Sequence, residues 1–295
     1  MFENIKTING LSEIIDKYDV FILDQWGVMH DGQNGYLNAI KCIEKLYSKK
    51  KILTIISNSS RKKEETILRL PNLGFQSSHF HEVMTSGEMI WSSLKNKNDN
   101  EVKHLGKRCF HIYDQTKNEG EIFQKGLEKY IFVKNIEDAD FILGCTPFSK
   151  RAVVDYIPLL KAAKKKDLLF VCANPDFDSI EKKSNSLTFC MGTIAELYNN
   201  LGGKTFILGK PSIEIYKKTF EKLANIKKSR ILAIGDSLFH DIRGAENFGI
   251  DSLLITSTGI HSDFFDNKNP SWKTINNSLK KLQITPTYVC KKLNF

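Results

Sequence analysis

Four polar side chains stand directly after, or one residue beyond, short apolar runs that the sequence predicts to be buried strands. They are Asp24, Ser57, Lys210 and Asp236. Because the carboxyl ends of parallel strands meet at the same edge of a sheet, we expect these side chains to lie together. The two carboxylates supply hard oxygen ligands of the kind that Mg²⁺ prefers. The Ser57 hydroxyl, the Asn58 side-chain amide and the Lys210 ammonium group suit the oxygens of a phosphate.

Such a set of groups predicts phosphoryl chemistry. A carboxylate held beside Mg²⁺ and a phosphate can attack phosphorus and form an aspartyl phosphate. The lysine and the metal would neutralise charge on the group being transferred. Each residue alone is weak evidence, since Asp24 followed by the turn-forming Gly27 and Gly32 also suits a polar residue that merely closes a strand. The convergence of all four positions favours the catalytic interpretation.

The elements that must position these residues alternate between strand and helix. This alternation, in the first and last parts of the chain, is typical of a parallel sheet with helices on both faces. The predicted strands are 18–23, 52–56, 205–208, 231–234 and 252–256, and the predicted helices include 36–49 and 61–70.

The middle of the chain repeats the alternation and predicts a second α/β unit. Its expected strands are 109–113, 130–133, 141–144 and 168–173, and a helix is expected over 151–165 with a kink at Pro158. We therefore expect a doubly wound α/β core domain formed by residues 1–83 and 203–295. Residues 84–202 would form an α/β cap domain inserted between the two parts of the core.

Composition indicates a soluble globular protein without a membrane segment. The 295 residues are 41% hydrophobic and 26% charged, which is outside the range of disordered chains. The apolar runs are far shorter than the roughly 20 residues that a membrane-spanning helix needs, and the N-terminus lacks the apolar core of a signal peptide. The six cysteines form no CxxC pair and favour buried, reduced thiols, so we expect a cytoplasmic protein.

The net charge of +9 raises the question of a nucleic-acid partner. The lysines are spread along the whole chain and aromatic residues do not alternate with them. Two lysine runs, 49–51 and 164–166, fall at the ends of predicted helices, where cations suit the helix dipole. A solvated basic surface is therefore the favoured interpretation, with no nucleic acid bound, and it would help to attract a phosphorylated small molecule.

The order and spacing of these motifs resemble those of the haloacid dehalogenase superfamily of phosphohydrolases. The sequence DQWGV at 24–28 matches the first motif, DxDx(T/V), except at its second aspartate. Ser57, at the end of a strand, matches the second motif, and Gly209-Lys210-Pro211 matches the third. GDSLFHDI at 235–242 matches the fourth, GDxxxxDI. A cap inserted between the second and third motifs resembles the class IIA branch, which includes NagD-type sugar and nucleotide phosphatases.

The resemblance implies a role for each motif residue. Asp24 would be the nucleophile and a Mg²⁺ ligand, and the backbone carbonyl of Trp26 would be a second ligand. Asp236 would bind the metal directly, and Asp241 would bind it through water or support it from behind a direct ligand, although Asp241 could instead simply cap the helix that follows. Ser57, Asn58 and Lys210 would bind the phosphoryl group.

Trp26 is the one departure from the first motif. In phosphatases of the superfamily, the second aspartate of this motif protonates the leaving group and then activates water. Trp26 has no titratable proton, and such acid–base help is typically worth about 10²–10⁴-fold in rate. Turnover of ordinary phosphate esters would then be slow, and good leaving groups would suffer less. His30 or Asp31 could take over this role, or could be residues of a turn.

Three further residues are candidates for substrate contacts under the cap. Trp26 could stack on a base or sugar, or pack against the cap. Asn174 and Asp176 follow a predicted cap strand, where they could contact substrate or simply form a turn.

The sequence thus predicts a Mg²⁺-dependent phosphatase for a small phosphorylated metabolite of the sugar phosphate or nucleotide class. The alternative is a catalytically impaired relative that binds a phosphorylated ligand in a regulatory role, which Trp26 motivates. A homodimer through the cap is left open, because the sequence does not fix the oligomeric state. The physiological substrate would depend on the cap loops.

Overall fold

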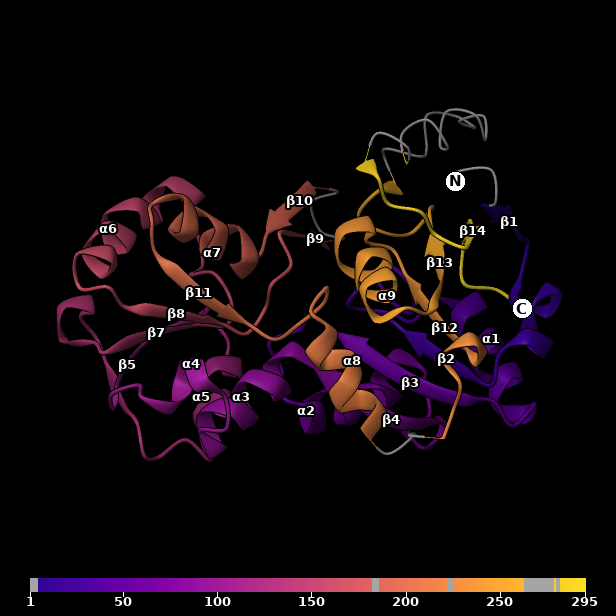
Figure 1. Cartoon of the computed structure of the whole chain (residues 1–295), viewed down its shortest axis with the longest axis horizontal. Coiled ribbons are helices and arrows are strands. Elements are labelled where there is room, and N and C mark those ends of the chain that lie inside the picture. The colour runs from indigo at the N-terminus through magenta and orange to yellow at the C-terminus, as the bar shows by residue number, and fades with distance from the viewer. Residues whose placement is uncertain (1–4, 182–185, 222–224, 263–278, 280–281) are drawn as a thin grey trace.

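The fold contains two separate all-parallel sheets, which lie side by side in Figure 1. The computed structural model describes residues 5–181, 186–221, 225–262, 279 and 282–295. Among these residues, the first sheet has seven strands and the second has five, and two further strands pair as an antiparallel hairpin. The hairpin strands, β9 and β10, lie between the two sheets in Figure 1. Their bounds are Asp178–Glu181 and Ser186–Phe189.

The seven-stranded sheet is built from the two ends of the chain. Its order is β1-β14-β13-β12-β2-β3-β4, and every neighbouring pair is parallel. β2 and β12, which precede the first and fourth motifs, are adjacent strands at its centre. The strands are β1 (Lys6–Thr7), β2 (Val20–Leu23), β3 (Ile52–Ser57), β4 (Phe80–Thr85), β12 (Ile231–Gly235), β13 (Asp251–Ile255) and β14 (Tyr288–Cys290).

Both faces of the central strands are buried, so successive residues of these strands pack in different cores. On β2, Phe21 and Leu23 pack with helix α1, whereas Val20 and Ile22 pack with helices α8 and α9. This burial on both faces explains why the central strands are continuous apolar runs rather than alternating ones. The helices of this part are α1 (Leu37–Ser48), α2 (Lys63–Arg69), α8 (Ile213–Phe220) and α9 (Arg243–Phe248).

The five-stranded sheet has helices on both faces as well. Its order is β11-β8-β7-β5-β6, and all of its pairs are parallel. Helices α6 and α7 cover one face, and α3, α4 and α5 cover the other (Figure 1). The strands are β5 (Arg108–Ile112), β6 (Ile131–Val133), β7 (Phe141–Gly144), β8 (Leu169–Cys172) and β11 (Lys204–Ile207). The helices are α3 (Ser86–Asn96), α4 (Asn100–Lys103), α5 (Glu119–Gln124), α6 (Ile157–Lys165) and α7 (Met191–Asn200).

The predicted fold class, a doubly wound parallel sheet with an α/β insertion, is confirmed, and two details differ. The strand before Lys210, β11, pairs with β8 in the five-stranded sheet, so Lys210 does not follow a strand of the core sheet as expected. Pro158 does not kink a long helix. It lies in the first turn of α6, where its missing N–H is harmless. The domain boundaries at 83/84 and 202/203 stay a prediction, and β11 lies just beyond the second of them.

Burial predicts where leucine truncation destabilises this fold. Leu53 in β3 is 0% exposed, whereas Leu68 in α2 is 76% exposed. We expect Leu53→Ala to lower the free energy of unfolding by about 2–5 kcal/mol, because it removes buried methyl groups and leaves a cavity. The same truncation at Leu68 should change it by less than about 0.5 kcal/mol. Urea denaturation of both variants measures this, and equal losses would contradict the core described for β3.

Candidate active site

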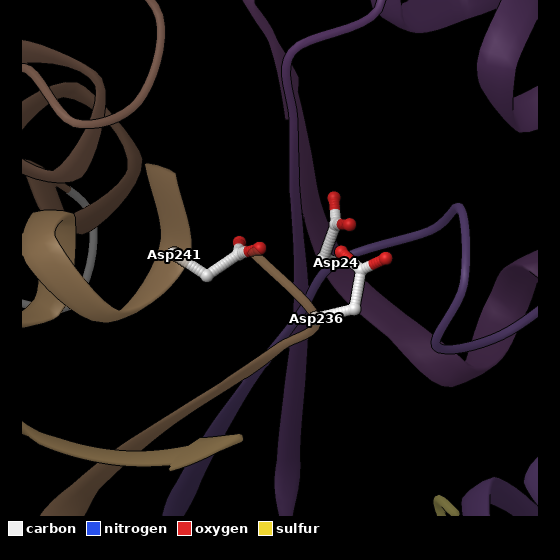
Figure 2. Close-up of side chains that lie close together, drawn as sticks. All are labelled: Asp24, Asp236 and Asp241. Atoms are coloured by element: carbon white, nitrogen blue, oxygen red, sulfur yellow. The ribbon is translucent and has the colours of Figure 1, made fainter. Parts of the chain in front are cut away.

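Three aspartates meet at the carboxyl edge of the seven-stranded sheet. Asp24 follows β2, Asp236 follows β12, and Asp241 lies in the single helical turn Leu238–Ile242 that comes next. One carboxylate oxygen from each lies within 4.8 Å of the other two. Figure 2 shows the three side chains pointing toward a common centre. The parallel pairing of β2 with β12 therefore brings Asp24 and Asp236 together at one edge of the sheet, as the sequence predicts.

Two glycines let the carboxylates approach this closely. A Cβ atom on Gly27, whose φ is +73°, would lie 2.2 Å from Asp236 Oδ2. A Cβ atom on Gly235 would lie 2.0 Å from Asp241 Cγ. Backbone N–H groups then fix the two acids, since Ile260 donates to Asp236 Oδ2 at 2.8 Å and Ser237 donates to Asp241 Oδ2 at 3.1 Å.

Lys210 supplies the positive charge of the cluster. Its Nζ donates to Asp24 Oδ1 at 2.7 Å and to Asp241 Oδ1 at 2.6 Å. Its side chain is only 4% exposed, so both ion pairs are removed from solvent. One ammonium group thus bridges two of the three carboxylates, although it arrives from the end of a strand in the other sheet.

The electrostatics of this cluster show an excess of negative charge. Burial raises the pKa of Asp24 to about 7, against the opposing effect of Lys210 and with a further rise from the charge of Asp241. Burial, and then the charges of Asp24 and Asp241, raise the pKa of Asp236 well above its usual value. Burial disfavours the charged form of Lys210, but the two carboxylates outweigh it and raise its pKa.

A divalent cation would relieve this excess. Three carboxylates that share one centre form an all-oxygen donor set, which fits a hard ion such as Mg²⁺ and suits no soft metal. Unlike the acids of an exposed patch, these three carboxylates are buried. Lys210, which pairs with Asp24 and Asp241, carries one positive charge and so neutralises only one of the three negative charges. The residues present therefore fit the metal that the motifs imply.

The cluster opens into a cavity of about 520 Å³. Core residues Asp24, Trp26 and Lys210 line it, together with residues of the inserted segment that include Asn174 and Asp176. Both parts of the chain therefore contribute to the site, and a ligand in the cavity could contact the carboxylate cluster and the insertion at once.

Comparison with known proteins places the chain in a family. A model of haloacid dehalogenase-like hydrolases matches residues 21–120, and a second model, described as HAD-hydrolase-like, matches residues 207–294. The two matched segments together include Asp24, Lys210, Asp236 and Asp241. The chain belongs to the haloacid dehalogenase-like hydrolases.

Relatives of this hydrolase extend over nearly the whole chain. A 4-nitrophenylphosphatase of Schizosaccharomyces pombe is 24% identical over 277 residues, covering 89% of this chain and 91% of that protein. An acid sugar phosphatase of Staphylococcus epidermidis is 22% identical, covering 94% and 96%. A haloacid dehalogenase-like hydrolase from Brucella suis has a solved structure with a TM-score of 0.80, 26% identity and coverage of 97% and 99%. These matches confirm the predicted class of enzyme, a phosphatase-type hydrolase of this superfamily.

Two residues of the second motif make hydrogen bonds within the protein. Asn58 Nδ2 donates to Asp176 Oδ1 at 2.8 Å and to the Lys210 carbonyl at 3.1 Å, and the expected contact of its amide with phosphate stays a prediction. Its Oδ1 accepts from the Lys210 N–H at 2.7 Å, so Asn58 positions Lys210. Ser57 is buried and its Oγ accepts from the Ser59 N–H at 3.3 Å, and its contact with phosphate stays a prediction.

The loop of the first motif gives no replacement for the missing aspartate. Trp26 lines the cavity, and its ring packs against Gly32 and edge-on to His30, with 5.4 Å between ring centroids. His30 is 1% exposed, its Nδ1 accepts from the Gly32 N–H at 3.0 Å, and burial lowers its pKa to about 4. Asp31 Oδ1 accepts N–H bonds from Gln33 and Asn34 and forms the turn. The suggestion that His30 supplies the acid is therefore wrong. Asp31 is a residue of the turn, which was the other interpretation of its position.

Several contacts of the site could not be predicted from residue types and their spacing. The N–H donors of Ser237 and Ile260 act through the backbone, which any residue type provides. Arg61 in the loop after β3 forms an ion pair with Glu119 at the start of α5, and both line the cavity. These two residues are 58 positions apart in the chain, so no local pattern in the sequence predicts their contact.

None of the helices in the described part of the chain has the length and apolar character that a membrane crossing requires.

The close approach at Gly27 predicts a selective loss of metal binding. Gly27→Ala should displace the Asp236 carboxylate and weaken Mg²⁺ binding by at least about tenfold, on the scale seen when partners that orient a metal ligand are lost. Gly202→Ala is the matched control, because Gly202 also has a positive φ, +81°, but a Cβ there would lie 3.6 Å from its nearest neighbour. Both variants should lose roughly 1–2 kcal/mol of stability from backbone strain, and Gly27→Ala should lose more because its Cβ would also lie 2.8 Å from the Gly259 Cα. Equal Mg²⁺ affinities by calorimetry would contradict this geometry.

The raised pKa values predict how Mg²⁺ binding responds to pH. Below about pH 7, Asp24 holds a proton in the metal-free protein, and the cation must displace it. The stabilisation by Mg²⁺, measured as the rise in Tm, should therefore be larger at pH 8 than at pH 5.5. Asp236→Asn should reduce the rise at both pH values. An equal rise at the two pH values in the native protein would contradict the raised pKa of Asp24.

Proposed function

We propose that this chain is a Mg²⁺-dependent phosphohydrolase that releases phosphate from a small phosphorylated metabolite through an aspartyl phosphate on Asp24. The observation that carries the proposal is the buried cluster of Asp24, Asp236, Asp241 and Lys210, which lines a cavity of about 520 Å³. Its geometry suits an anionic nucleophile, a cation and a phosphate in mutual contact.

In the proposed reaction, an oxygen of Asp24 attacks phosphorus and the ester bond to the leaving group breaks. Mg²⁺ held by Asp24, Asp236, Asp241 and the Trp26 carbonyl would offset the charge of the phosphate. Lys210, already within 2.7 Å of Asp24, would hold a phosphate oxygen beside the nucleophile and stabilise the charge of the transition state. Ser57 would donate its hydroxyl to another oxygen of the same group.

The comparisons support the metal and the class of substrate. A glycerol phosphate phosphatase from Mycobacterium tuberculosis, solved in complex with magnesium, shares the fold with a TM-score of 0.64 at 20% identity, over 94% of this chain and 76% of that one. Two relatives are named 4-nitrophenylphosphatase and acid sugar phosphatase. A cavity of about 520 Å³ lies within the range typical of small-molecule sites. We therefore propose sugar phosphates or nucleotides as substrates, in a cytoplasmic setting.

Trp26 favours a second candidate, a protein that binds a phosphorylated ligand in a regulatory role without turning it over. The residue in this position cannot protonate a leaving group, and neither neighbour in its loop replaces it. The enzymatic proposal stands ahead of it, because the nucleophile, the metal ligands and the lysine are all in place. Ligand-induced thermal shifts without phosphate release from any metabolite would favour the regulatory candidate.

Removal of the nucleophile tests the proposal. We expect Asp24→Asn to abolish phosphate release from a panel of sugar phosphates and nucleotides in the presence of Mg²⁺. The control is Asp16→Asn, the same change at an exposed position outside the cavity, which should leave the rate unchanged. A phosphate-release assay measures both. Activity that survives Asp24→Asn would end the assignment of Asp24 as nucleophile.

The missing acid predicts a strong dependence on the leaving group. We expect 4-nitrophenyl phosphate, whose phenolate needs no proton to leave, to be cleaved about 10²-fold faster or more than an alkyl phosphate such as glycerol phosphate. Values of kcat/KM for the two substrates at saturating Mg²⁺ measure this, because kcat/KM includes the step in which the leaving group departs, whereas the aspartyl phosphate that follows is the same for both. Equal values of kcat/KM would show that another group protonates the leaving oxygen.

A further inference from the structure

Hydrolysis of the proposed aspartyl phosphate needs a group that accepts a proton from water. The first-motif loop does not supply one, since Trp26 has no basic atom and His30 is buried. The three clustered aspartates and Lys210 are engaged with one another and with the metal and phosphate of the proposed reaction. The acceptor must therefore come from elsewhere in the cavity wall.

Asp176, in the inserted segment, reaches across the cavity to the core. Its Oδ1 accepts from Asn58 Nδ2 at 2.8 Å and lies 3.3 Å from His240 Nδ1. Among the described residues, its Oδ2 has no hydrogen-bond donor, and the side chain is 35% exposed and lines the cavity. Donors on one oxygen hold the carboxylate in place and leave the other oxygen available to water.

The segment that carries Asp176 lies directly against the catalytic lysine. A Cβ atom on Gly209, the residue before Lys210, would lie 2.7 Å from Pro175 Cγ and 2.6 Å from Asn58 Oδ1. The charge of Asp176 is also close enough to contribute to the raised pKa values of Asp24 and Lys210. A single side chain, Asn58, connects the carboxylate of Asp176 to the backbone of Lys210.

The other carboxylates that line the cavity make different contacts, and none of those contacts is with Asn58 or His240 in the described structure. Asp114 lies 3.5 Å from the Lys117 ammonium group, and Glu119 pairs with Arg61. Asp31 accepts two backbone N–H groups within its own turn. Asp178 lies on hairpin strand β9 and, in the described structure, contacts neither Asn58 nor His240. Asp176 is thus the cavity carboxylate tied to the phosphate-binding lysine.

We propose that Asp176 is the general base of the second half-reaction, an inference that rests on the proposed phosphohydrolase function. A proton of the attacking water passes to Asp176 Oδ2 while the water oxygen bonds to phosphorus. The bond between phosphorus and the Asp24 oxygen breaks, and its electron pair returns to the Asp24 carboxylate. Inorganic phosphate leaves, and protonated Asp176 loses its proton to solvent.

The test is pre-steady-state hydrolysis of 4-nitrophenyl phosphate by Asp176→Asn. This substrate needs no acid to leave, so the first step should still occur and release about one equivalent of 4-nitrophenolate per site in a burst. Steady-state turnover should then fall by about 10²-fold or more. Phosphate should remain on the protein as an acyl phosphate that hydroxylamine removes. Asp176→Glu, which keeps a carboxylate, should recover part of the turnover.

Two controls separate this role from a structural one. Asp138→Asn, at an exposed position of the inserted segment, should behave as the native protein. His240→Gln disturbs the contact with Asp176 but keeps the base, so it should raise KM without trapping phosphate on the protein. If Asp176→Asn showed the same behaviour as His240→Gln, with no burst and no trapped phosphate, the inference would be overturned. Absence of phosphate release by the native protein would instead overturn the proposed function itself.

Discussion

Mutual repulsion among three buried carboxylates is the constraint on which this structure depends. Asp24, Asp236 and Asp241 share one centre with a single ammonium group, and burial together with their like charges raises the pKa of two of them. Such a cluster is costly in a folded protein unless a cation compensates it. The fold maintains it through fixed backbone donors and the buried bridge from Lys210. In the proposed function, the same charges would bind a metal and direct a nucleophile at phosphorus.

The two sheets position different side chains of the site. The seven-stranded sheet delivers Asp24 and Asp236 from adjacent parallel strands, which sets the spacing of the acids. The five-stranded sheet delivers Lys210 through β11, and the inserted segment adds Asp176 across the cavity. Asn58 connects the two parts, because it binds the backbone of Lys210 and the side chain of Asp176 together. Any relative movement of the two parts would therefore alter the position of the lysine as well as the access to the site.

The sequence predicts that Asp24 and Asp236 lie close together, but it does not predict which residues contact the cluster around them. Asp24 and Asp236 follow apolar strands, and strand ends in a parallel sheet converge, so periodicity alone placed them together. The same rule misplaced the strand before Lys210, because pattern does not say which of two sheets a strand joins. The contact of Asn58 with Asp176 joins positions 118 residues apart, and no local pattern encodes it. The burial of His30 depends on how its loop folds back on Trp26, which composition does not reveal.

A crystal structure of the protein with Mg²⁺ and beryllium fluoride most directly tests the idea that one metal and one phosphoryl group share this cluster. Beryllium fluoride mimics a phosphoryl group bonded to a carboxylate. It should be found on an oxygen of Asp24, with Lys210 on one fluorine and Mg²⁺ bound between Asp24 and Asp236. Beryllium fluoride bound away from Asp24, or Mg²⁺ bound outside the three aspartates, would contradict the proposed catalytic centre.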